Sequence, residues 1–451
     1  MNAVNTDLYA GDFRRLESSL PGRDAPWLGR LRRDALAWFL DRGLPGPRDE
    51  AWKYTDLKAL AKHGLRPAGP GEAGTVDERA LQPHLLGGAY RLVFVDGRLN
   101  PRLSDVERLP KGVTVSSLAA ALEERPGALE AVLGRHAAHD ANGFAALNTA
   151  LFADGAYVHI GRNIELERPI QLVYLSTGLC TGNSAEDGAA AHLRNVVVAD
   201  SGSRAVVIES YAAGIETGAY ATNALTEIVL EDNASVEHYK LQREAEQSFH
   251  VAGLHVHQGR DSRYTGHNVA LGSRLARSDL HAVLDAEGAE CHLNGLNLTH
   301  GRQHVDNHLV VEHRRPHGTS RQWYKGVLDG RSRTVFSGRV IVSPDAQHTD
   351  AEQRNNNLLL SEHAEADSRP QLEIYADDVK CSHGATVGQL DADALFYLRS
   401  RAIDYELARN LLVYAFASDI LERMGLQPVH DQLQEQITGR LLGARSLEEV
   451  L

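Results

Sequence analysis

Cysteine is scarce in this 451-residue chain, which contains only Cys180, Cys291 and Cys381. Three scattered cysteines form no disulfide framework, so we expect a reducing compartment. No apolar run approaches the roughly 18 residues needed to cross a bilayer, and the N-terminal segment lacks the apolar core of a secretory signal. These absences predict a soluble, cytoplasmic protein.

Positive charge is also in short supply. The chain has 47 lysines and arginines against 60 aspartates and glutamates, a formal net charge of −13. Nucleic-acid-binding proteins usually present a basic face, and anionic membrane surfaces attract basic segments. We therefore expect neither nucleic acid nor a membrane among the partners.

Several enzyme motifs are missing. The dipeptide Gly-Lys does not occur, which excludes a P-loop. The sequence also lacks a G-x-S-x-G nucleophile elbow, a G-x-G-x-x-G dinucleotide fingerprint and a C-x-x-C pair. The sequence thus gives no support to an ATPase, a hydrolase of that type or a dinucleotide-dependent enzyme.

The first part of the chain, residues 1–155, reads as a mixed α/β region. Asp24 is placed to cap a helix with Pro26 in its first turn, and Gly43 is placed to end it. Residues 89–95 have the composition of a strand, and residues 118–133 that of a helix.

Residues 156–390 change to short β runs separated by turns, without a long helix. Examples are Leu172–Leu175, Val196–Val198, Val206–Ile208, Ile228–Leu230, Val236–Leu241, Leu293–Leu298, Leu309–Val311, Val335–Val342 and Leu372–Tyr375. Small residues after the turns, at Ser203, Ser235, Ser262, Ala289 and Ser320, are spaced by 32, 27, 27 and 31 residues. Such a period favours a solenoid of stacked strands, a β-helix. A jelly roll or double sandwich is the alternative.

Residues 391–451 return to helical periodicity. Asp391 is placed to cap a short helix, and apolar residues from Ile403 to Leu421 recur at helical spacing. Gly425 and Pro428 would end that helix, and a second one is expected over Gln432–Leu442.

His304, Asp306 and His308 are each two residues apart, and so are His255 and His257. A strand would place each set on one face. Two imidazoles and a carboxylate could bind a divalent metal. A solvated polar face of a half-exposed strand is the other interpretation.

Cys381 and His383 form the second candidate site. Two residues apart, they would share one strand face, and Lys380 beside them could favour the thiolate. Thiolate and imidazole are suitable ligands for iron or zinc, although two ligands are too few for a cluster. A buried cysteine beside a hydrogen-bonded histidine is the alternative. Their strand is the last before the C-terminal helices, so it could lie at a subunit interface where a second chain supplies further ligands.

Four runs resemble the C-terminal core of the SufB/SufD family of iron–sulfur cluster assembly proteins. They are Val335–Val342, Asp350–Ser361, Pro370–Thr386 and Leu395–Arg401. The motif from Arg48 to Thr55 (RDEAWKYT) is similar to the SufD branch in particular. Ala402 departs from the family pattern, which usually has glycine at this position. The departure affects the expected conformation of the local turn and not the resemblance itself.

The resemblance implies a mainly β fold, a right-handed parallel β-helix with a flanking N-terminal α/β region and C-terminal helices. It also implies a non-catalytic scaffold that pairs with a SufB-like paralogue and docks a SufC-like ATPase through residues 391–451. His383, and to a lesser extent Cys381, would be ligands of a transient iron–sulfur cluster at the subunit interface. We expect no cofactor to be bound stably by this chain alone. A homodimer in isolation is a further expectation.

Two enzyme functions stand as alternatives. One is a metal-dependent enzyme built on the face of His304, Asp306 and His308. The other is a carbohydrate-active β-helix enzyme, which would need clustered carboxylates in a groove.

Overall fold

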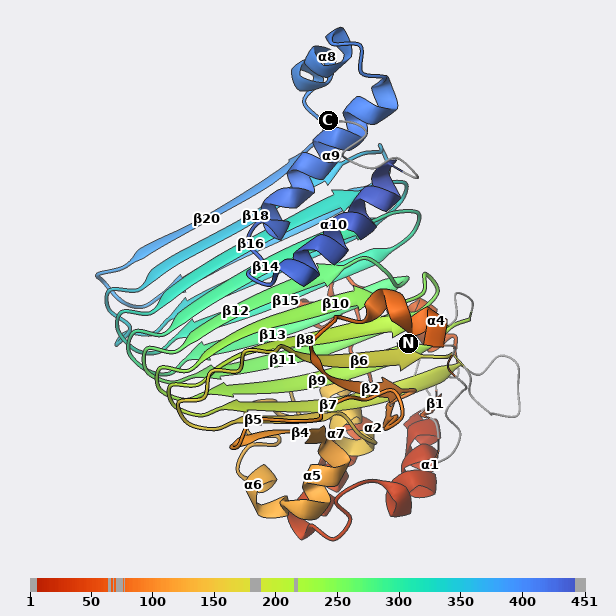
Figure 1. The fold of residues 1–451 in the computed structure, drawn as a ribbon, viewed down its shortest axis with the longest axis vertical. Coiled ribbons are helices and arrows are strands. Elements are labelled where there is room, and N and C mark those ends of the chain that lie inside the picture. Colours follow the sequence, from red (N-terminus) through yellow and green to blue (C-terminus); the bar gives the residue numbers. More distant parts are fainter. Residues whose placement is uncertain are drawn as a thin grey trace.

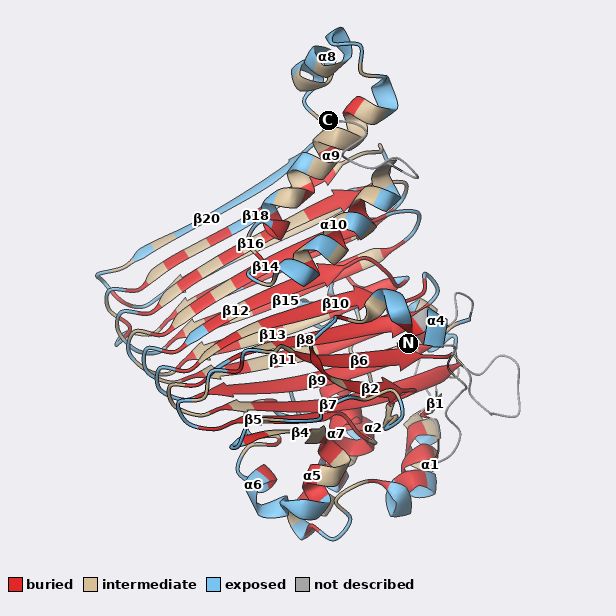
Figure 2. Cartoon of the chain, in the orientation of Figure 1, coloured by how far each residue is buried: buried red, intermediate tan, exposed pale blue. Residues whose placement is uncertain are grey.

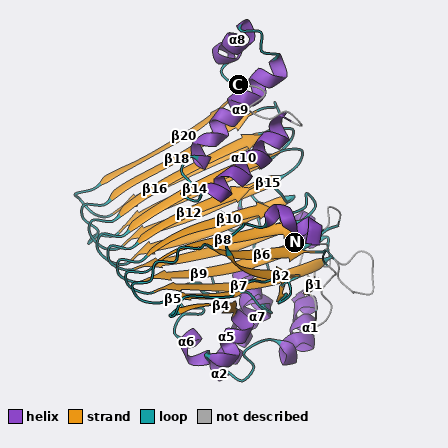
Figure 3. Cartoon of the chain, in the orientation of Figure 1, coloured by secondary structure: helices purple, strands orange, loops and turns teal. Residues whose placement is uncertain are grey.

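The computed structural model describes residues 6–63, 66–67, 69, 76, 78–178, 188–214 and 218–442. It shows a long stack of strands with helices at both ends (Figures 1 and 3). Cys180 lies outside the described residues. None of the described helices is long and apolar enough to cross a membrane.

Successive strands of the stack alternate between two sheets of ten strands each. From β5 onward the pairing within each sheet is parallel, apart from the antiparallel β4–β5 pair. The odd-numbered sheet contains β1 (Arg66–Pro67), β4 (Val113–Ser117), β5 (Ala156–Ile160), β7 (Ala189–Ala199), β9 (Ala221–Leu230), β11 (Phe249–Gln258), β13 (Leu275–Leu284), β15 (His304–His313), β17 (Arg333–Val342) and β19 (Glu365–Ile374). The even-numbered sheet contains β2 (Tyr90–Val95), β3 (Arg98–Leu99), β6 (Ile170–Ser176), β8 (Arg204–Ala213), β10 (Ser235–Arg243), β12 (Arg263–Ala270), β14 (Glu290–Thr299), β16 (Thr319–Leu328), β18 (Asp350–Leu359) and β20 (Lys380–Gly388). This arrangement is a parallel β-helix, as the sequence predicted, and not a jelly roll or sandwich.

The register of the stack corrects the positions of the sequence repeat. The first residues of β8, β10, β12, β14, β16, β18 and β20 pair in one column: Arg204, Ser235, Arg263, Glu290, Thr319, Asp350 and Lys380. Ser262 and Ala289 each precede their strand by one residue, as Ser203 does, whereas Ser235 and Ser320 lie one and two residues further along. A left-handed turn residue recurs just before these strands, at Gly202, Asn233, Asp261, Gly288, His317 and His348. Small polar residues and glycine tolerate that conformation best, which explains the turn signal in the sequence.

Alternate residues of each strand point into the β-helix, and the interior has an apolar half and a polar half. The apolar half includes Val207, Val236, Ile228, Val256 and Leu284. The polar half is fully buried and includes the following side chains: Glu209, His238, Gln242, His250, Asn268, Asn307, Gln322 and Gln353. Buried polar groups need hydrogen-bond partners, so this half depends on ladders of bonds between neighbouring strands.

The N-terminal region packs on the outer face of the odd-numbered sheet and extends both sheets through β2, β3 and β4. Its helices are α1 (Thr6–Leu16), α2 (Pro26–Arg42), α3 (Lys58–Ala61), α4 (Glu78–Leu81), α5 (Leu118–Glu124), α6 (Pro126–Glu130) and α7 (Gly143–Leu151), with 3-10 turns at Glu17–Ser19, Glu50–Trp52 and Gln82–His84. Two local predictions were wrong. Ala25, not Asp24, precedes α2, without a side-chain cap. The helix expected over 118–133 is divided before Pro126, because proline cannot donate the helical hydrogen bond.

Three helices follow the last strand: α8 (Ala392–Ser400), α9 (Tyr405–Leu421) and α10 (Gln427–Leu442). Asp391 caps α8 as predicted, accepting hydrogen bonds from the backbone N–H groups of Asp393 and Ala394. α9 and α10 pack on the outer face of the even-numbered sheet. α10 begins at Gln427, earlier than predicted, because Pro428 occupies its first turn, where a missing N–H is tolerated.

Ala402, the departure from the family, lies in the turn between α8 and α9. Its φ is +64°, in the left-handed region that favours glycine. A residue with a side chain costs about 1 kcal/mol there. The turn between α8 and α9 therefore keeps the left-handed conformation that glycine would adopt, and the alanine lowers its stability.

Candidate functional site

Strand β20, which carries Cys381 and His383, is the terminal strand of the even-numbered sheet. It pairs with β18 on one side and with no described strand on the other. Figure 2 shows that it is exposed along most of its length, in contrast to the buried strands before it. The sequence placed these two residues on the last strand of the stack, and the structure confirms that this strand is an open edge.

The backbone alternation shows which groups of β20 are available. The N–H of Lys380 donates to the carbonyl oxygen of Thr349. The peptide N–H and C=O groups of the even-numbered residues of β20 therefore point toward β18. In a parallel ladder the intervening residues turn their peptide groups the other way. The N–H and C=O groups of Cys381, His383, Ala385 and Val387 therefore face the open edge.

The neighbouring end strand, β19, is less suited to pairing. Its odd-numbered residues bond to β17, beginning with the N–H of Glu365 to Ser332 O. Pro370 consequently falls at an open-edge position, where it offers no donor. Proline at such a place is a common way to prevent pairing of an edge strand. β20 contains no proline, so it is the end strand with an uninterrupted row of donors and acceptors.

Cys381 and His383 share the face of β20 that points into the β-helix. Cys381 is in register with buried Ala351, and His383 with buried Gln353. Because no further strand covers this end, Cys381 is partly exposed and His383 is exposed. Both side chains can therefore be reached by a molecule that continues the stack.

The thiols differ in their surroundings. Burial raises the pKa of Cys381, an effect only partly offset by a backbone hydrogen bond with Ala351. Lys380 lies on the opposite face of the strand, so it does not favour the thiolate in the way the sequence suggested. Cys291 occupies the same interior column three strands deeper, where burial raises its pKa to about 12. Cys381 is thus the more accessible thiol of the two described, and its raised pKa disfavours the thiolate.

Exposed apolar side chains gather at the same end of the molecule. The described large hydrophobic residues that are exposed are Leu40, Ile374, Tyr375, Val387, Phe396, Tyr397 and Tyr405. All but Leu40 belong to the last strands or to α8 and α9 and their neighbours. Phe396 is 74% exposed, and α8, which has no buried residue, projects beyond the stack (Figure 1). Apolar surface of this kind marks interaction sites.

The face of His304, Asp306 and His308 has a structural role instead. Asp306 is buried and forms an ion pair with Arg277, and it accepts a hydrogen bond from Thr55 Oγ1. The same hydroxyl lies 3.0 Å from His304 Nε2. Arg277 also stacks on Trp52 and donates to Ala51 O. In the part of the chain that the structure describes, no group of three or more His, Cys, Asp or Glu side chains is arranged to hold a metal ion.

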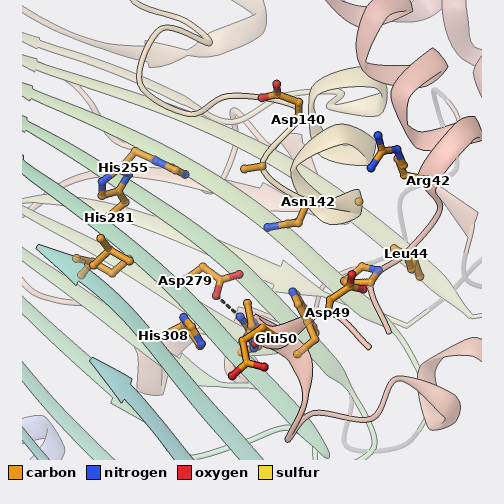
Figure 4. A pocket seen from close by; sticks show the side chains of 18 of the residues that line it. Arg42, Leu44, Asp49, Glu50, Asp140, Asn142, His255, Asp279, His281 and His308 are labelled. Atoms are coloured by element: carbon orange, nitrogen blue, oxygen red, sulfur yellow. Dashed lines mark hydrogen bonds and ion pairs between the residues drawn. The ribbon is translucent and has the colours of Figure 1, made fainter. Parts of the chain in front are cut away.

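A cleft beside this contact separates the N-terminal region from the odd-numbered sheet. Figure 4 shows His255, His281 and His308 on its strand side and Asp49 and Glu50 on its N-terminal side. Several of its carboxylates are already paired: Asp279 with Arg277, Glu312 with His281 and Arg314, and Glu50 with Arg369. Three of the five carboxylates that line the cleft are thus held in ion pairs, and the other two are Asp49 and Asp140.

Two family models and several known proteins match this chain. Residues 180–416 match the family model for the SufBD core domain of SUF-system FeS cluster assembly, and residues 4–172 match the model for the SufBD protein N-terminal region. An iron–sulfur cluster assembly SufBD family protein of Synechocystis is 37% identical, covering 88% of each chain. The chain belongs to the SufBD family. SufD of Escherichia coli is 33% identical over 90% of this chain and 92% of that protein, and SufD of Bacillus subtilis is 26% identical over 91% and 93%.

Within this SufBD chain, sequence analysis singled out Cys381 and His383 as candidates but missed several buried polar residues and the contacts of the N-terminal motif. It assigned no role to Gln353, since a glutamine in a β run reads as a solvent-facing residue. It also quoted the motif from Arg48 to Thr55 only as a family resemblance. The structure shows what that motif does, because Trp52 and Thr55 bind Arg277 and Asp306, more than 220 residues away.

Proposed function

We propose that this chain is a non-catalytic scaffold subunit of an iron–sulfur cluster assembly complex, in which β20 pairs with a SufB-like paralogue. The observation that carries the proposal is the open edge of β20, with Cys381 and His383 on it. A sister β-helix that continues the stack would satisfy the free peptide groups and cover Ile374 and Val387. It would also add its own ligands to those of this chain.

His383 is the ligand we assign to the cluster on this side of the interface. Neutral imidazole binds iron without losing a proton, and His383 is exposed at the end of the stack. Cys381 would need to lose a proton from a thiol whose pKa is raised by burial, so it is the weaker candidate. The cluster is cargo, held transiently between two chains and passed on, and the reaction takes place in the reducing cytoplasm.

The C-terminal helices are the place for a SufC-like ATPase. α8 and the start of α9 expose Phe396, Tyr397 and Tyr405, whereas the rest of α9 is fixed to the stack. Lys325 of β16 forms an ion pair with Asp419 of α9 at 3.0 Å and donates to Phe416 O. A movement of α9 driven by ATP would therefore reach β16, two strands from β20 in the sheet.

Replacing His383 by alanine tests the ligand role. We expect His383→Ala to co-purify with the SufB-like and SufC-like partners at unchanged stoichiometry, because the edge pairing uses backbone groups. Cluster maturation in the co-expressed complex, measured from iron and sulfide content and the visible spectrum, should fall by about tenfold or more. Cys381→Ala is the matched control on the same face and should have a smaller effect. Unchanged maturation in His383→Ala would reject the ligand role.

A further inference from the structure

A short ladder of two buried amides lies next to His383 in the interior of the β-helix. Gln322 of β16 and Gln353 of β18 both point inward and have no exposed surface. Gln353 Nε2 donates to Gln322 Oε1 at 2.8 Å. The next residue in this column is His383, which is in register with Gln353. The exposed imidazole is thus the outermost member of an otherwise buried polar column.

The outer end of this ladder has an unsatisfied acceptor. Gln353 Oε1 is buried and has no hydrogen-bond partner. Leaving such an oxygen unpaired costs about 1–3 kcal/mol, so a donor nearby would be strongly favoured. Gly338 on the opposite sheet lies against the amide, and any side chain there would overlap Gln353 Nε2. The absence of a side chain at Gly338 leaves the room that this amide occupies.

His383 is the neighbour of Gln353 in register, although in the structure its ring does not bond to this oxygen. Neighbouring strands are about 4.8 Å apart, and residues in register point to the same side. A neutral imidazole carries one N–H donor and one lone pair. The ring can therefore donate to Gln353 Oε1 while its other nitrogen faces the open end of the stack.

We propose that Gln353 is a positioning residue, whose Oε1 accepts the N–H of His383 and holds the imidazole in one tautomer, with the remaining lone pair directed at the cluster iron. Its purpose rests on the function proposed above, but the proposed hydrogen bond would form within this chain and needs no partner subunit. Metal-binding histidines are commonly oriented by an acceptor on the second ring nitrogen, and loss of that acceptor weakens metal binding by about 10–100-fold.

The tautomer of His383 tests this proposal without any cluster. Long-range ¹H–¹⁵N NMR of the full chain, labelled on histidine nitrogen, distinguishes the two neutral tautomers, and His383→Ala identifies the signals of this ring. We expect a single tautomer in the wild-type chain. Gln353→Met removes the acceptor at similar size and should give a mixture of tautomers, whereas Gln353→Glu keeps an acceptor oxygen and should retain the single form.

Two results would overturn the proposal: a mixture in the wild-type chain, or an unchanged single tautomer in Gln353→Met. The first needs no variant, so it decides the matter even if Gln353→Met does not fold. In the co-expressed complex, Gln353→Met should shorten cluster retention by about tenfold. If His383→Ala leaves maturation unchanged while the wild-type ring is fixed, the ligand role fails and the positioning contact stands. If the wild-type ring shows both tautomers while His383→Ala lowers cluster maturation, the positioning contact fails and the ligand role stands.

Discussion

Ala385→Pro is expected to separate this chain from a SufB-like partner while leaving its own fold intact. Ala385 lies on β20 with its N–H toward the open edge, so proline removes a donor to the partner and none to β18. The proline ring also obstructs close approach of a second strand. We expect at least a tenfold loss of affinity, which corresponds to about 1.4 kcal/mol. Co-purification from cells expressing all three chains, followed by sedimentation, measures it.

The controls for this variant lie in the same strand and in the same complex. Ala385→Val keeps the N–H and should keep the SufB-like partner. The SufC-like ATPase should stay bound to Ala385→Pro, because its proposed site on α8 and α9 does not include β20. Retention of the SufB-like chain by a well-folded Ala385→Pro variant would show that the partner does not pair along this edge.

Arg194→Met is expected to destabilise the chain by about 3–5 kcal/mol, the usual result of leaving one charge of a buried pair. Arg194 of β7 and Glu227 of β9 have no exposed side-chain surface, and Arg194 Nη2 lies 2.6 Å from Glu227 Oε1. Glu227 also accepts the backbone N–H groups of Gly134, His136 and Ala137. The pair thus fixes the N-terminal region to the outer face of the odd-numbered sheet.

The electrostatics of Glu227 explain why the loss of Arg194 would lower the stability of the fold. Burial alone would raise the pKa of Glu227, but the charge of Arg194 and the backbone hydrogen bonds lower it overall. Without Arg194 the carboxylate must stay charged in a buried site or bind a proton. The shift of the urea midpoint at neutral pH measures the loss of stability.

An exposed pair provides the comparison. Arg263 and Glu290 form the same kind of cross-strand ion pair at 2.8 Å, but on the surface. Arg263→Met should change stability by less than about 1 kcal/mol. Adding Glu227→Gln to Arg194→Met should recover part of the loss, because the amide keeps an acceptor without the charge. Equal effects of Arg194→Met and Arg263→Met would contradict the structural role of the buried pair.

Local patterns in the sequence predicted many of the elements of this fold. The quoted β runs from Leu172 to Val342 fall within strands, and the last run extends one residue past β19, which ends at Ile374. Asp391 caps a helix, and the turn at Ala402 has the left-handed conformation that favours glycine. These features depend on neighbouring residues, so they can be read without knowing the fold. The position of Cys381 and His383 at the end of the stack followed from their place before the last helices.

Other features depend on which strands lie side by side, and these could not be predicted. Thr55 and Asp306 are 251 residues apart, and their hydrogen bond exists only because the N-terminal segment packs on β15. The inward direction of Gln353 follows from the register of β16, β18 and β20. In the sequence alone, the alternation of Asp306 with two histidines suggested a metal site, whereas the contact with Arg277 neutralises that carboxylate.

Amide hydrogen exchange along β20 tests most directly whether this strand is the pairing edge. In the chain alone, diluted until it sediments as a monomer, the N–H groups of Cys381, His383, Ala385 and Val387 should exchange rapidly. Those of Ser382, Gly384 and Thr386, directed at β18, should exchange slowly. In the complex with the SufB-like chain the first set should become as slow as the second. Rapid exchange of the first set in both states would contradict edge pairing.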